Sequence, residues 1–198
     1  MVDYWKPQYL VEKSFQSPVP VLLLAGVLAF LLLDVVVVSI AGISIDWKNT
    51  LLSAGVHGAR LVVLSLVIFC FGLLVGRHSP QVRLGPVFTV VGIIQLVGAL
   101  FGFLFLGIMV FGTNWPEFAS VASQTPAIDL APTLSDVAAP EISFWAFGVL
   151  LLFGIILVLF SMSLLYRLVR KMVDRGFLVN AMITLLVLVI TAFFSFGF

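Results

Sequence analysis

Five long apolar segments, separated by short polar stretches, dominate the pattern of the chain. Runs such as Leu31–Leu33 and Val35–Val38 show none of the polar and apolar alternation that transmembrane β-strands have. Each segment is close to or above the roughly 20 apolar residues that a helix needs to cross the hydrocarbon core. The pattern therefore predicts an all-α bundle of five transmembrane helices. The segments run from about Val19 to Ile45, Ala59 to Gly76, Pro86 to Gly112, Ile142 to Tyr166 and Phe177 to Phe198.

The composition supports a membrane location. Hydrophobic residues make up 62% of the chain and charged residues 10%, with a mean hydropathy of +1.26. Soluble domains are nearer to about 50% apolar and about 25% charged. We therefore expect an integral membrane protein, in the plasma membrane or, in a prokaryote, the inner membrane. The net charge of +1 gives no reason to expect nucleic acid as a partner, and the single cysteine excludes an internal disulfide.

The distribution of basic residues predicts the orientation, because Lys and Arg concentrate on the cytoplasmic side of short loops. Eight of the ten Lys and Arg residues alternate onto one side of the five predicted spans. Only Lys48 and Arg60 fall on the other side. The pattern predicts a cytosolic N-terminus and an external C-terminus. The eight residues are Lys6, Lys13, Arg77, Arg83, Arg167, Arg170, Lys171 and Arg175.

The chain divides into a short tail and one transmembrane domain. We expect residues 1–18 to form a cytosolic tail whose aromatic and apolar side chains, mixed with Lys6 and Lys13, suit the membrane interface. Packing of this tail on the bundle is an equal alternative. Residues 19–198 form a single five-helix domain. Its loop at 113–141 has no Lys or Arg and is rich in small residues and proline, so we expect it to be external and irregular.

Asp34 is the leading candidate for chemistry inside the bilayer. It lies between Leu33 and Val35, where a bare carboxylate costs about 3 kcal/mol. We expect Asp34 to be protonated, paired or exposed to a wet cavity. Arg60 and His57 are the candidate partners, because the second span begins at the face where the first ends. A structural pair and a functional proton or cation site are both open alternatives.

Other polar and small residues within the spans predict helix packing. Gln95 and Asn180 are expected to form interhelical hydrogen bonds. Small residues four positions apart allow helix backbones to approach closely. Three such pairs are Ala25 and Ala29, Gly72 and Gly76, and Gly98 and Gly102.

The sequence contains no recognisable catalytic or metal-binding set. His57 and His78 lie near opposite ends of the second predicted span, and Cys70 is distant from both. We find no Ser-His-Asp set, no Gly-rich phosphate loop and no His-Glu-x-x-His motif. We therefore expect a protein that is not an enzyme and that binds neither a metal nor a cofactor.

A basic cluster follows the fourth predicted span. Arg167, Arg170 and Lys171 lie within about one turn, and Arg175 lies one turn further. Clusters of this kind bind anionic lipid headgroups at the inner leaflet. Membrane lipids, including anionic ones, are therefore expected partners, although a purely topological role explains the same residues.

The layout resembles that of the Yip family, small five-helix membrane proteins named for their interaction with Ypt/Rab GTPases. The segment from Lys6 to Glu12, followed by Ser17 to Pro20, is similar to the entry of prokaryotic members into their first span. The basic stretch from Arg167 to Arg175, with Gly176 before the last apolar segment, resembles their last hairpin. The resemblance implies a five-helix fold and a role in membrane organisation or trafficking.

Three functions remain open from the sequence. The first is a non-enzymatic membrane scaffold or adaptor, acting through helix, lipid and protein contacts. The second is an accessory subunit of a larger membrane complex, with protein partners or a second copy of the chain. The third is a small proton- or ion-coupled transporter that uses Asp34, which requires a wet cavity reaching that residue.

Overall fold

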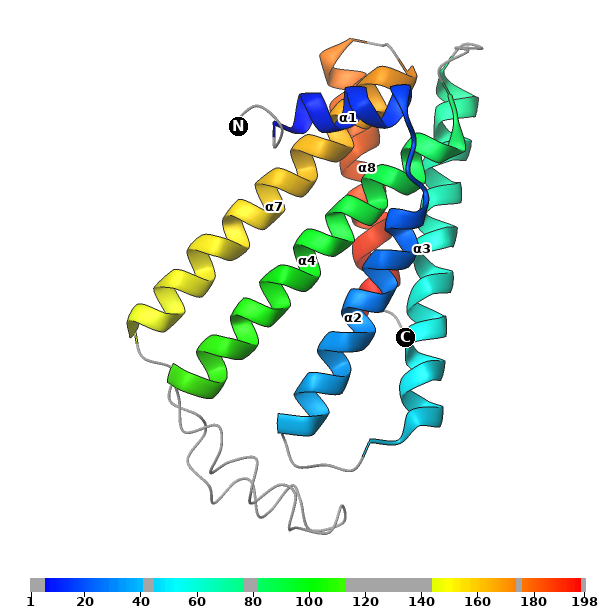
Figure 1. The fold of residues 1–198 in the computed structure, drawn as a ribbon. Coiled ribbons are helices and arrows are strands. Elements are labelled where there is room, and N and C mark those ends of the chain that lie inside the picture. The colour runs from blue at the N-terminus through cyan, green and yellow to red at the C-terminus, as the bar shows by residue number, and fades with distance from the viewer. Residues whose placement is uncertain (1–5, 41–44, 77–81, 113–143, 174–175, 197–198) are drawn as a thin grey trace.

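A computed structural model describes residues 6–40, 45–76, 82–112, 144–173 and 176–196 (Figure 1). Every regular element in these residues is an α-helix, which confirms the all-α class. The predicted loop at 113–141 lies outside the described residues. The helices are α1 (Pro7–Gln16), α2 (Val21–Ile40), α3 (Trp47–Val75), α4 (Leu84–Gly112), α7 (Phe144–Val173) and α8 (Phe177–Phe196).

Four of the described helices are long and apolar enough to cross a membrane. Their apolar stretches are Val21–Ile40, Trp47–Val75, Leu84–Ile108 and Trp145–Val173. The stretch Phe177–Val189 of α8 is also apolar but shorter. An integral membrane protein, as predicted from composition, is compatible with these four helices.

The helix α3 begins well before the apolar run that predicted it. Asp46 precedes the helix, and its side chain accepts hydrogen bonds from the backbone N–H groups of Lys48 and Asn49 at 3.1 and 3.3 Å. These bonds satisfy N–H groups that have no partner within the helix. The cap fixes the start of the helix at Trp47, so the predicted start at Ala59 was too late. The first turns of α3 contain polar residues, and the apolar run used for the prediction begins only after them.

The helix α1 lies across one end of the bundle, where it packs on α7 and α4 (Figure 1). It begins at Pro7, in a position where the missing N–H of proline costs nothing. Val11 and Ser14 are buried against the bundle, and the Ser14 hydroxyl donates to the Val11 carbonyl oxygen at 2.7 Å. Glu12 and Lys13 are exposed on the opposite side. The amphipathic pattern of the tail thus orients α1 across the helix ends.

The largest buried side chains concentrate at the α1 end of the bundle. This core combines the end of α7 with the first halves of α4 and α8 and the end of α3. The other half of α7 is largely exposed, with Leu151 and Leu152 as examples. The bundle is therefore packed most tightly near α1. Its fully buried side chains include Ile68, Val87, Val90, Leu164, Leu168, Val169, Met172 and Val187.

Glycines bring α2 and α4 into direct contact. A Cβ atom on Gly92 would collide with the backbone of Leu22 and would lie 2.5 Å from the Leu23 nitrogen. A Cβ on Gly102 would lie 2.5 Å from Leu33 Cδ2. We call the contact of α2 with Gly92 and Gly102 of α4 the α2–α4 seam. At Gly102 the neighbour is the Leu33 side chain, whereas at Gly92, which was not among the predicted pairs, two backbones touch.

A hydrogen bond fixes the start of α2 at this seam. The backbone N–H of Val19 donates to Oγ1 of Thr89 at 2.8 Å, and the same hydroxyl donates to the Gly85 carbonyl oxygen at 2.9 Å. Thr89 is buried. One hydroxyl therefore joins the entry of α2 to the first turns of α4.

Substitution of Thr89 by valine should destabilise the bundle by about 1 kcal/mol, because the shape of the side chain is kept while the hydrogen bond is lost. Unfolding in detergent micelles with increasing SDS, followed by circular dichroism, measures the change. Thr89→Ser keeps the hydroxyl and should retain most of the stability. Equal losses for valine and serine would show that the methyl group, and not the hydrogen bond, is responsible.

Candidate functional site

Four of the five polar residues proposed within the spans lie around one position in the middle of the bundle, and Asn180 of α8 is not among them. His57 of α3 is central to them. Gln95 of α4 is within interaction range of the imidazole, and the charges of Asp34 on α2 and Arg60 on α3 act on it. We call these four residues the polar cluster. Three consecutive helices, α2, α3 and α4, contribute to it.

Close packing of α2, α3 and α4 positions the cluster. The Phe30 ring of α2 lies 4.8 Å from the His57 ring, centroid to centroid. The same Phe30 lies over Gly98 of α4, where an added Cβ would be 3.6 Å from Cζ. Gln95 packs against α2 at Gly26, whose added Cβ would lie only 2.8 Å from Gln95 Cβ. Phe30 and Gln95 therefore hold the imidazole between the three helices.

The cluster has unsatisfied polar groups. The Nε2 atom of His57 is buried and has no hydrogen-bond partner in the described part of the chain. Asp34 is exposed on the surface of the described helices, and its carboxylate makes no hydrogen bond or ion pair with a described residue. The structure thus brings Asp34 and Arg60 each within electrostatic range of His57, and Asp34 forms no direct pair with either predicted partner.

The chemistry available to the cluster is proton binding and hydrogen bonding. Imidazole and carboxylate groups both bind protons, and Asp34 is costly in its charged form at membrane depth. No group of three or more His, Cys, Asp or Glu residues able to hold a metal occurs among the described residues. Cys70 is exposed on α3. The side chains of the polar cluster can therefore bind a proton or contact a cation.

The predicted lipid-binding residues lie at one end of the bundle, beside α1. Arg167 donates from Nη1 to Oε1 of Gln8 at 3.2 Å, and Lys171 Nζ lies 5.6 Å from the centre of the Phe15 ring. Arg170 is exposed. Arg175 lies outside the described residues. Two of the basic side chains thus contact neutral groups of α1, which leaves their positive charge without compensation from those contacts.

Sequence reasoning missed the hydroxyl groups buried among the helices. Ser65 and Thr184 are buried, and each donates to the carbonyl oxygen four residues earlier, Leu61 and Asn180, at 2.8 Å. Asn180, predicted as an interhelical residue, is also fully buried on α8. Single hydroxyl residues within apolar runs are the sequence signal for such bonds.

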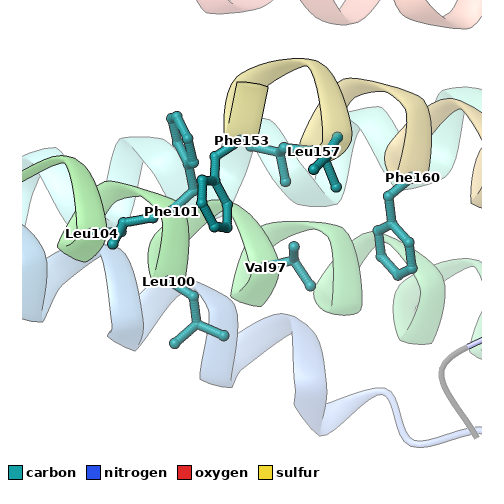
Figure 2. A pocket seen from close by; sticks show the side chains of 8 residues that line it. Val97, Leu100, Phe101, Leu104, Phe153, Leu157 and Phe160 are labelled. Atoms are coloured by element: carbon teal, nitrogen blue, oxygen red, sulfur yellow. The ribbon is translucent and has the colours of Figure 1, made fainter. Parts of the chain in front are cut away.

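An apolar groove between α4 and α7 was also missed (Figure 2). Its volume is about 350 Å³. Phe101 of α4 lies against α7 at Gly154, whose added Cβ would be 3.8 Å from Phe101 Cζ. No pattern in the sequence marks this groove, because it depends on how far the two helices separate. It is lined by Val97, Leu100, Phe101, Leu104, Phe153, Ile156, Leu157 and Phe160.

Comparison of the chain with protein-family models, with curated proteins and with solved structures found no match.

Proposed function

We propose that the chain is a non-enzymatic integral membrane scaffold or adaptor that acts through helix, lipid and protein contacts. In this proposal α8 is the fifth span, the N-terminus is cytosolic and the C-terminus external. The observation that carries the proposal is that the helices pack tightly inside the bundle, here called the locked interior, while their outer faces are apolar and extensively exposed. The resemblance to the Yip family supports the same class of role, in membrane organisation or trafficking.

The locked interior is the α2–α4 seam together with the core beside α1. Backbone contact at Gly92 leaves no space for a central pathway between α2 and α4. Val87 and Leu164 are fully buried on α4 and α7. A tightly packed helix bundle suits a protein that keeps a fixed shape in contact with other membrane proteins and lipids.

The exposed faces are broad and apolar. On α2, the side chains of Leu24, Leu28 and Leu32 are each more than half exposed and follow one another at four-residue spacing. On α8, Leu178 and Met182 are similarly exposed. In a bilayer these stripes contact lipid chains or the helices of other proteins, which is the surface that an adaptor needs.

The charges at the two ends support the proposed orientation. Described basic side chains at the α1 end are Lys6, Lys13, Arg83, Arg167, Arg170 and Lys171. Glu12 is the one acidic side chain among the described residues of that end. Lys and Arg favour the cytoplasmic side, which supports a cytosolic α1 in this proposal.

Photo-crosslinking tests the adaptor proposal. A photoreactive amino acid replaces Leu28 on α2 or Met182 on α8 in the full chain, in its native membrane. We expect a discrete protein adduct from at least one position, identified by mass spectrometry. An extraction in mild detergent should retain the same protein. Adducts to lipid alone from both positions, with a protein that purifies as a single monomeric species, would refute the adaptor.

The polar cluster favours a second candidate, a small proton- or ion-coupled transporter. An exposed carboxylate at Asp34, within electrostatic range of His57, is the kind of group that such proteins use. The accessory-subunit alternative explains the same exposure if a helix of another protein covers Asp34.

We expect Asp34→Asn to leave ion and proton flux unchanged in proteoliposomes, because the adaptor proposal gives the carboxylate no transport role. Flux is followed with a pH-sensitive dye enclosed in the vesicles. Asp46→Asn, at the cap of α3, is the matched control for removal of one negative charge. Flux in the wild type that disappears in Asp34→Asn and persists in Asp46→Asn would establish the transporter instead.

A further inference from the structure

The groove between α4 and α7 is suited to a lipid chain. All eight of its lining side chains are apolar. Several remain exposed, with 66% of Leu100 and 52% of Ile156 accessible. Both helices are among the four that could span a membrane, so the groove opens toward the hydrocarbon region and not toward water. Its volume of about 350 Å³ falls in the range of small-molecule sites.

One side of α7 leads from the edge of the groove at Ile156 to the basic cluster. Ile156, Leu159, Ser163, Tyr166 and Arg170 follow one another at three- and four-residue spacing, which places them on one side of a helix. Leu159 is exposed next to the groove and Arg170 is exposed at the end of the stripe. This side of α7 therefore runs from the apolar edge of the groove, past Ser163 and Tyr166, to a cation.

The distances fit a phospholipid in the leaflet beside α1. At 1.5 Å per residue, Phe160 lies about 10 Å and Phe153 about 21 Å along the helix axis from Arg167. One leaflet of the hydrocarbon core is about 15 Å thick. An acyl chain whose headgroup lies beside Arg167 thus reaches the part of the groove between Phe160 and Phe153.

The charges at the headgroup end favour an anion. Arg167 bonds to the neutral amide of Gln8, and Lys171 lies over the Phe15 ring, so neither contact neutralises the cation. Arg170 makes no hydrogen bond or ion pair with a described residue. A phosphodiester with net negative charge supplies the oxygen acceptors that guanidinium groups bind best.

We propose that α4 and α7 form a binding site for one anionic phospholipid, with its headgroup at Arg170 and Arg167 and an acyl chain in the groove lined by Phe101, Phe153 and Phe160. The site is independent of the adaptor function. It differs from diffuse attraction of a basic surface because it requires both a particular cation and a particular chain length.

Native mass spectrometry of the full chain, released from detergent with added phosphatidylglycerol or phosphatidylcholine, tests the site. We expect one retained dioleoyl phosphatidylglycerol per chain, bound more tightly than dioleoyl phosphatidylcholine. Arg170→Gln should weaken phosphatidylglycerol binding about fivefold and remove most of the preference over phosphatidylcholine. Arg83→Gln, which removes an exposed charge at the same end from the start of α4, should have little effect.

The chain-length requirement is tested on the wild type, so it does not depend on a variant folding. Dihexanoyl phosphatidylglycerol has the same headgroup but is too short to fill the groove, and we expect weaker retention. Ile156→Trp, at an exposed lining position, should weaken binding of the long-chain lipid only. Equal losses in Arg83→Gln and Arg170→Gln, or equal retention of long and short chains by the wild type, would overturn the proposal.

Discussion

Gly92→Ala should lower the stability of the bundle by about 3 kcal/mol, the upper end for an overpacked interior. The new methyl group would meet the backbone at Leu22 and Leu23, and not the flexible end of a side chain. A side chain can rotate away from a close contact, but the backbone of α2 must move as a whole. Unfolding with SDS in mixed micelles, followed by circular dichroism, measures the loss.

Gly107→Ala is the matched control for that substitution. Gly107 lies on the same helix, and an added Cβ there has nothing within 4 Å. Alanine favours a helix over glycine, so the control should be neutral or slightly stabilising. If the two variants unfold at the same SDS fraction, backbone contact at Gly92 does not hold α2 and α4 together.

Leu168→Ala should destabilise the bundle by about 2–5 kcal/mol, because Leu168 is fully buried where α7 meets the core beside α1. Truncation leaves a cavity that neighbouring helices fill only in part. Lipid chains do not reach this position, so they cannot replace the lost contacts. The same SDS titration gives the change in unfolding free energy.

Leu159→Ala removes the same atoms from an exposed position on the same helix. Leu159 has 61% of its surface accessible, so in a bilayer lipid chains occupy the space that the side chain leaves. We expect its effect to be below about 0.5 kcal/mol. A large loss in Leu159→Ala, with a small one in Leu168→Ala, would mean that the interior of the bundle is arranged differently.

The helices were predictable because apolar runs of this length have few alternatives. The boundaries were less so, since they depend on single polar groups. The start of α3 is set by the Asp46 cap, and a single capping residue leaves no mark in a hydropathy profile. The seam was predicted in part: the pair Gly98 and Gly102 follows the four-residue rule, whereas Gly92 has no small neighbour four positions away on either side.

The polar cluster was predictable residue by residue. A carboxylate, an imidazole, a guanidinium and an amide stand out in apolar runs, and the threading of consecutive helices brings Asp34 and His57 to one depth. The groove was not predictable, because it depends on how α4 and α7 are placed relative to one another. Its lining is apolar, as are the filled parts of the bundle.

The backbone contact at Gly92 also limits how the molecule can change shape. Helices separated by layers of side chains shear past one another through small rotamer adjustments. At Gly92 no such layer exists, so α2 and α4 must tilt as one rigid body. Any hinge or sliding motion is thereby confined to the other interfaces of the bundle, among them that of α4 with α7. Such motion would widen or narrow the space beside Phe101 while the distance between α2 and α4 stayed constant.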